Sequence, residues 1–162
     1  MKKILFLIIA SAMISSCGKQ GCTDPLAENF SSDATKEDNS CLYSIVGDWE
    51  MQTYILNGDD ISSNFTDYTF HCYSDNSYWS EALILGQANY IDIVGEYTLN
   101  STHTQIELQN QEVDYNDGNG WQVDNSFSNF TINSLTNDVI NMTLSSSSST
   151  TVSSIELILV KI

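Results

Sequence analysis

Four cysteines and two histidines are the side chains of this chain best suited to chemistry. His71 points outward in an expected strand and His103 falls in an expected hairpin turn, and neither has a histidine or cysteine partner at metal-binding spacing. The sequence also lacks a nucleophile elbow and a phosphate-binding glycine loop. A Ser–His–Asp arrangement stays open, because its members can lie far apart in sequence. We expect a protein that is not an enzyme and holds no metal or cofactor.

The cysteines differ in their surroundings. Cys22 and Cys41 flank a compact, loop-like segment, and they are the natural disulfide pair in an oxidising compartment. Cys72 lies in a strand pattern between aromatic residues, which predicts a buried and inert thiol. Cys17 follows a charged start, a short apolar run over residues 4–10 and a zone of small residues, in the order typical of a secretory signal.

The segment Ile14-Ser15-Ser16-Cys17 resembles the lipobox of bacterial lipoproteins, with isoleucine in place of the usual leucine. The resemblance implies that residues 1–16 are a signal peptide and that Cys17 becomes the lipidated first residue, with palmitate among its acyl chains. Residues 17–21 then tether the protein to the bacterial cell envelope, at the outer membrane. Several acyl chains together would hold it firmly in the membrane. The alternative is an ordinary cleaved signal with a chance cysteine. The lack of an acidic cluster after Cys17 favours a periplasm-facing position.

The charge of the chain limits its partners. The net charge is −16 at pH 7, and Asp and Glu outnumber Lys and Arg by 21 to 5. Such a surface repels phosphate backbones and anionic lipid head groups, which excludes nucleic acid as an expected partner. It could attract cations or basic ligands, although solubility in a salty medium is the favoured explanation.

Residues 22–43 form a loop-rich segment that contains the only proline, Pro25. The stretches Gly21-Cys22-Thr23-Asp24-Pro25 and Asn39-Ser40-Cys41 resemble the two ends of a short cysteine-framed repeat in exported Bacteroidetes proteins. A segment this small needs a staple, which the Cys22–Cys41 bridge would supply around a minimal apolar cluster. That cluster is expected to comprise Leu26, Ala27 and Phe30. Calcium is a further possibility, but the spacing is not that of an EF-hand and a solvated loop is favoured. The oxygens considered are those of Asp24, Asp33, Asp38 and Asn39.

Residues 44–162 alternate polar and apolar residues with the period of strands. About eight strands are expected, at the spacing of a sandwich or an up-and-down barrel. Residues 110–124 are expected to form a long acidic loop. The expected strands cover residues 47–56, 67–73, 77–85, 95–99, 104–109, 127–135, 139–145 and 152–161.

The stretch Ile45-Val46-Gly47-Asp48-Trp49 resembles the opening of lipocalins, in which glycine lets the chain turn and tryptophan plugs the closed end of the barrel. Residues 68–78 and 95–99 are similar to lipocalin-like lipoproteins of Bacteroidetes. The resemblance implies an all-β, antiparallel, up-and-down barrel over residues 44–162. In such a barrel the first and last strands pair, which would bring Lys161 onto Trp49. The inward face of the first strand is expected to carry Trp49, Met51, Thr53 and Ile55.

Two functions follow from this fold. The first is a non-catalytic barrel that binds a small apolar or amphipathic ligand, although the same side chains could simply fill a narrow barrel, which is the favoured arrangement. The second is a structural or protein-interaction lipoprotein, including an inhibitor, that meets an envelope protein through residues 110–124, with Tyr115 and Trp121 as contacts. The residues expected to line the interior are Tyr68, Phe70, Tyr97, Ile106, Leu108 and Met142.

Overall fold

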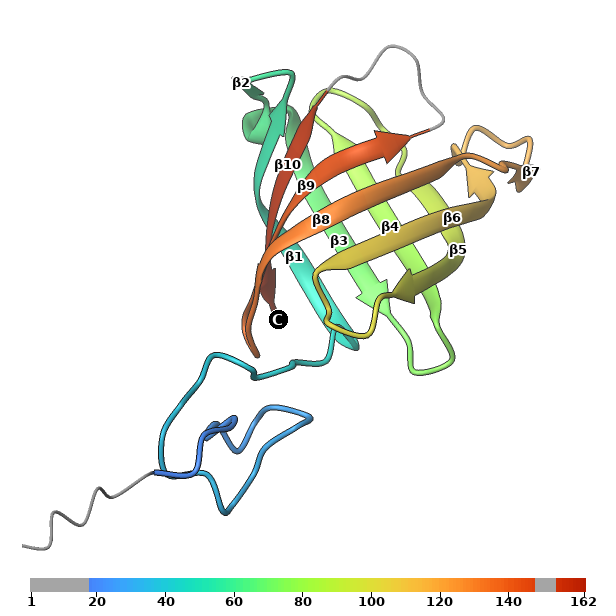
Figure 1. Ribbon diagram of the computed structural model, residues 1–162. Coiled ribbons are helices and arrows are strands. Elements are labelled where there is room, and N and C mark those ends of the chain that lie inside the picture. Colours follow the sequence, from blue (N-terminus) through green and yellow to red (C-terminus); the bar gives the residue numbers. More distant parts are fainter. Residues whose placement is uncertain (1–17, 148–153) are drawn as a thin grey trace, which may run out of the picture.

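The computed structural model describes residues 18–147 and 154–162, so the predicted signal peptide and the predicted lipidation site at Cys17 lie outside the described residues. Eight long strands close into an antiparallel barrel (Figure 1). Three short elements lie at one end of the barrel: the strands β2 (Asp59–Asp60) and β7 (Gln122–Val123) and the 3₁₀ turn η1 (Ser62–Asn64). The long strands are β1 (Gly47–Leu56), β3 (Phe65–Cys72), β4 (Ser77–Ile84), β5 (Ile91–Leu99), β6 (Gln105–Asp114), β8 (Phe127–Leu135), β9 (Val139–Ser147) and β10 (Ile155–Lys161).

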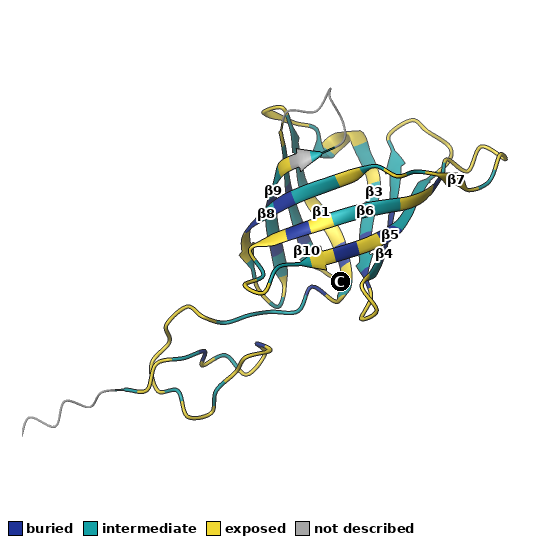
Figure 2. Ribbon diagram, turned by 45° about the vertical axis from the view of Figure 1, so that its right-hand side comes forward, coloured by how far each residue is buried: buried dark blue, intermediate teal, exposed yellow. Residues whose placement is uncertain are grey.

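Each long strand pairs with the next long strand along the chain, and β10 returns to pair with β1. This closure confirms the predicted up-and-down barrel, which removes the free edges that an open sheet would expose. Figure 2 shows buried and exposed residues alternating along the strands, as expected when one face of each strand points into the barrel.

Two strands are longer than the sequence predicted. β5 begins at Ile91 rather than residue 95, and β6 continues to Asp114, so residues 110–114 are not part of the expected acidic loop. A bulge separates the two halves of this pair, because Val94 lies opposite Glu112 whereas Gly95 lies opposite Asn110. The extra residue, Gln111, interrupts the alternation of polar and apolar side chains and hides the continuation of the strand.

A second bulge corrects the predicted inward face of β1. The pairing with β10 shifts between Met51 and Thr53, so that Met51 lies opposite Leu159 and Tyr54 lies opposite Leu157. Directly opposite residues share a face of the sheet, and both leucines are buried in the core. Tyr54 therefore faces inward, and the expectation that Thr53 and Ile55 do so is wrong.

The closed end of the barrel is built around Trp49, which has no exposed surface. Its indole Nε1 donates a hydrogen bond to the Ile45 carbonyl oxygen at 2.8 Å. Lys161 lies directly opposite in the β1–β10 register, and its ammonium nitrogen is 5.4 Å from the centroid of the indole. Gly47 has φ 143°, and a Cβ atom there would approach Lys161 Cε to 2.9 Å, so glycine leaves room for the lysine stem.

Replacing Trp49 with alanine should lower the free energy of unfolding by about 3–5 kcal/mol, because a large buried aromatic side chain is lost. Replacing Lys161 with alanine should lower it by less than about 1 kcal/mol, because an exposed cation contributes little through its contact with the ring. Urea denaturation of both variants measures the difference. Equal losses for the two variants would contradict the assigned roles.

Candidate functional site

A cavity of about 200 Å³ lies inside the barrel, toward the end opposite Trp49. All eight long strands contribute to its wall, so the closure of the barrel is what creates it. The residues that line it are Tyr54, Tyr68, Phe70, Tyr78, Ser80, Ile93, Leu108, Asn110, Ser128, Phe130, Met142, Ile155, Leu157 and Leu159.

Four of the six residues expected to line the interior do line this cavity, namely Tyr68, Phe70, Leu108 and Met142. The other two, Tyr97 and Ile106, belong to the core but not to the cavity wall. The Tyr97 hydroxyl donates to the Tyr73 carbonyl oxygen at 2.8 Å, in the turn between β3 and β4, and burial raises the pKa of Tyr97 to about 12. These two side chains therefore belong to the filled half of the barrel.

Sequence reasoning missed several wall residues for identifiable reasons. Tyr54 is turned inward by the bulge in β1, and Ile93 and Asn110 lie in parts of β5 and β6 that were not expected to be strand. Ser80 is 7% exposed although it is polar, and only the pattern of β4, in which Tyr78, Ser80 and Ala82 alternate, could have placed it inside.

One polar chain of contacts leads from the cavity to the barrel surface. The Tyr78 hydroxyl donates to Asn110 Oδ1. The Asn110 amide nitrogen donates to Asp124 Oδ2 and to Ser126 Oγ, both at 2.9 Å. Burial acts to raise the pKa of Asp124, but the hydrogen bonds from Asn110 and Ser126 outweigh it and hold the pKa below its ordinary value. Asn110 and Asp124 are therefore already paired with each other.

Other hydroxyl groups in the wall lack such partners. Within the described residues, the hydroxyls of Tyr54, Tyr68, Ser80 and Ser128 accept and donate no hydrogen bond. Among the described residues, every fully buried polar side-chain atom has a hydrogen-bond partner, so these unpaired hydroxyls keep some accessible surface. Burial raises the pKa of Tyr54 and, much further, that of Tyr68, which keeps both as neutral hydroxyls.

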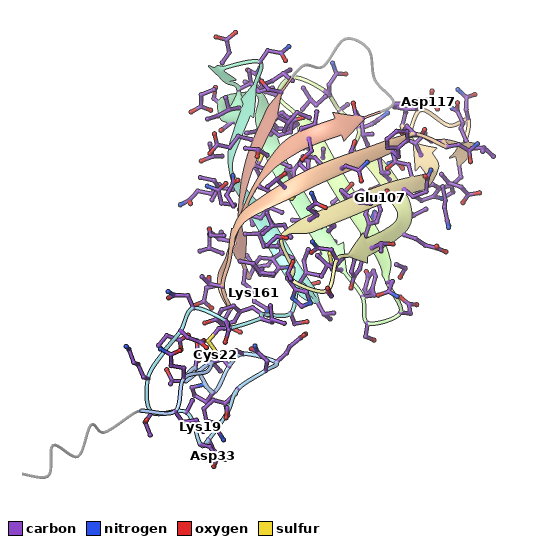
Figure 3. The ribbon with its side chains drawn as sticks, viewed as in Figure 1. Lys19, Cys22, Asp33, Glu107, Asp117 and Lys161 are labelled. Atoms are coloured by element: carbon purple, nitrogen blue, oxygen red, sulfur yellow. A yellow bond between two sulfur atoms is a disulfide. The ribbon has the colours of Figure 1, made fainter. Side chains whose placement is uncertain are left out.

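A second feature stands at the open end of the barrel, where residues 114–124 form an acidic ribbon that includes β7. Tyr115, Trp121 and Val123 are 47%, 48% and 75% exposed there. Figure 3 shows Asp117 of this ribbon at the end of the barrel opposite Lys161. The side-chain nitrogen of Asn116 donates to Asp92 Oδ2 at 2.7 Å, and this bond fixes the base of the ribbon to β5.

The two histidines lie outside the cavity. His71 Nδ1 is 2.7 Å from Asp48 Oδ1, and its Nε2 is 3.2 Å from Thr69 Oγ1, a sequence of groups like that of a catalytic triad. The Thr69 hydroxyl, however, donates to Glu81 Oε1 at 3.0 Å, so its proton is directed away from the imidazole. His103 Nδ1 lies 2.9 Å from the Tyr43 carbonyl oxygen and links the N-terminal segment to the barrel.

The predicted Cys22–Cys41 disulfide is present, and Cys72 is a free, buried thiol whose pKa is raised by burial. The expected apolar cluster around the bridge is wrong in two of its members. Ala27 is buried, but Leu26 and Phe30 are 63% and 44% exposed, because so short a loop cannot enclose large side chains.

The acidic groups of the N-terminal segment are used in separate local contacts. Asp24 accepts hydrogen bonds from the Tyr43 hydroxyl and the Leu26 amide, which lower its pKa, and Asp33 pairs with Lys19 at 2.9 Å. Asp38 accepts a hydrogen bond from the Ser40 amide. Across the described residues, one group has metal-ligating atoms close enough together, Cys22, Glu37 and Cys41, and its two sulfur atoms form the disulfide.

Within residues 18–147 and 154–162, no helix has the length and apolar character needed to cross a membrane. No protein-family model and no curated protein matches this chain.

Replacing Cys22 and Cys41 together with serine should open the N-terminal segment and leave the barrel folded, because the strand pairing closes on itself between Gly47 and Lys161. Limited proteolysis with mass mapping should show new cleavage only within residues 18–44. Urea denaturation followed by tryptophan fluorescence should keep its midpoint. A large fall in that midpoint would show that the bridge stabilises the barrel itself.

Proposed function

We propose that this protein is a cell-envelope lipoprotein whose non-catalytic, lipocalin-like barrel binds a small apolar or amphipathic molecule. The observation that carries the proposal is the cavity of about 200 Å³ that the eight long strands line. An apolar cavity of about 150 Å³ in a protein can hold benzene, so a ligand of roughly ten non-hydrogen atoms is of the right size. Aliphatic side chains and aromatic rings would hold its body, and hydroxyl groups would fix its orientation.

The proposed anchor rests on the sequence Ile14-Ser15-Ser16-Cys17 and on the signal-like residues before it. Residues 19–21 are held to the disulfide-bonded segment, because the Lys19 carbonyl oxygen accepts from the Thr35 and Lys36 backbone amides and the Gly21 backbone amide donates to the Lys36 carbonyl oxygen. Acyl chains on Cys17 would hold the barrel within a short distance of the membrane surface, facing the periplasm at the outer membrane.

Replacement of Cys17 with alanine should move the protein from the membrane fraction to the aqueous fraction, because its proposed acyl chains can no longer attach. Cell fractionation with immunodetection and intact-mass measurement of the purified protein test this. Replacement of Cys72 with alanine is the matched control and should leave the protein in the membrane fraction. A Cys17→Ala protein that stays with the membranes would overturn the proposed anchor.

Filling the cavity should abolish ligand binding. Ser80→Leu adds an apolar side chain inside the wall, while Ser134→Leu makes the same change at an exposed position of β8. Titration with 2-naphthol, followed by its fluorescence, should show binding to the unmodified protein and to Ser134→Leu, and at least about tenfold weaker binding to Ser80→Leu. Unchanged affinity of the Ser80→Leu variant would show that the probe binds elsewhere.

A second candidate function is favoured by the exposure of Tyr115, Trp121 and Val123 on the acidic ribbon. Large apolar side chains that are exposed beside acidic groups are typical of a surface that meets another protein. The Ser80→Leu variant separates the two functions, since it alters the cavity and leaves the ribbon intact. A partner that binds this variant normally would use the ribbon.

A further inference from the structure

We propose that the cavity selects an uncharged ligand that carries a hydroxyl or carbonyl group, and that it rejects an isosteric carboxylate. The inference rests on the proposed ligand-binding function and names its substrate class. It rests on the charge of the side chains that line the cavity and on the hydroxyl groups there that have no hydrogen-bond partner.

The first step concerns charge. Every described residue in the wall is neutral, with apolar side chains and hydroxyl or amide groups as its chemistry. A carboxylate moved into this volume would lose its hydration without gaining a cation, which is strongly unfavourable. The three lysines of the described residues lie elsewhere: Lys19 and Lys36 are in the N-terminal segment, and Lys161 covers Trp49 at the closed end. The net charge of −16 adds repulsion during the approach of an anion.

The second step concerns positive charge. The Asp124 carboxylate is linked to the wall by its hydrogen bond from the side-chain nitrogen of Asn110. Its oxygens already accept hydrogen bonds from the side-chain amide of Asn110 and from the backbone N–H and the hydroxyl of Ser126. These three hydrogen bonds hold most of the acceptor sites of the Asp124 carboxylate, so a cationic ligand would have to compete with them. The same desolvation argument therefore disfavours a buried ammonium group.

The third step identifies the polar contacts that remain. Asn110 has no side-chain N–H left to donate, because its nitrogen donates to Asp124 and Ser126, and its oxygen already accepts from Tyr78. Among the described residues, the wall hydroxyls without a hydrogen bond are those of Tyr54, Tyr68, Ser80 and Ser128, and a hydroxyl can donate to a carbonyl oxygen or accept from an alcohol. A neutral ligand with one such group gains a hydrogen bond and leaves no charge unpaired.

The test compares four ligands built on one naphthalene ring system: 2-naphthol, naphthalene, 2-naphthoate and 2-naphthylmethylammonium. Titrations at neutral pH and moderate salt use the full mature protein. We expect 2-naphthol to bind at least about tenfold more tightly than either charged compound, because the charge is buried without a partner. We expect naphthalene to bind more weakly than 2-naphthol by about three- to tenfold, the usual effect of one neutral hydrogen bond.

Two variants show whether the hydroxyl in the wall is responsible. Tyr68→Phe should weaken the binding of 2-naphthol by about three- to tenfold and leave the binding of naphthalene unchanged, because only the former uses the hydroxyl. Tyr115→Phe, on the exposed ribbon, is the matched control and should change neither. A Tyr68→Phe variant that does not fold is replaced by Ser80→Ala, which removes the neighbouring free hydroxyl.

The outcomes separate this inference from the proposed function. Binding of 2-naphthoate or 2-naphthylmethylammonium as tight as that of 2-naphthol overturns the selection for neutral ligands, while ligand binding itself stands. Equal loss of naphthalene and 2-naphthol in Tyr68→Phe overturns the role of the hydroxyl. Absence of binding by all four compounds overturns the proposed function, and this inference with it.

Discussion

The pairing of β10 with β1 is the constraint on which the rest of the structure depends. It joins the two ends of a meander in which each long strand otherwise pairs only with the strands next to it. It also removes both free edges of the sheet at once. The same pairing sets Lys161 opposite Trp49, so the strand pair that closes the barrel also positions the side chains at its closed end. Gly47 is needed at this point because the lysine stem lies where a side chain would be. A break in this pairing would open the wall of the cavity as well as the sheet.

Closure divides the interior into two unlike halves. Around Trp49 the space is filled by side chains such as Ile45, Tyr97, Ile106 and Ile140, all of them buried. Toward the other end the wall remains apolar and aromatic, but a cavity of about 200 Å³ is left, with neutral hydroxyls at its border. The division gives the molecule a rigid, packed base and a site whose size and chemistry restrict the ligand. The proposed ligand class follows from that chemistry, because an enclosed wall without charge favours a neutral molecule.

Much of this fold could be predicted from the sequence, because strand periodicity and turn residues recur along residues 47–161 with little interruption. The disulfide was predictable for a similar reason, since Cys22 and Cys41 frame a short segment. The site was less predictable. Bulges at Gln52 and Gln111 change which face of the strand is buried, and the sequence does not show where such an extra residue lies. The sequence favoured a filled barrel, whereas a cavity depends on how side chains from all eight strands meet, which no local pattern records.

The central claim is that the barrel encloses a volume that a small apolar molecule can occupy. Xenon occupies apolar cavities of about this size, so a crystal of the protein exposed to xenon under pressure tests the claim most directly. The account predicts a xenon atom inside the barrel in contact with Phe70, Leu108 and Met142. Loss of that atom in the Ser80→Leu variant would identify the same volume. A barrel whose interior takes up no xenon, with these side chains packed against one another, would contradict it.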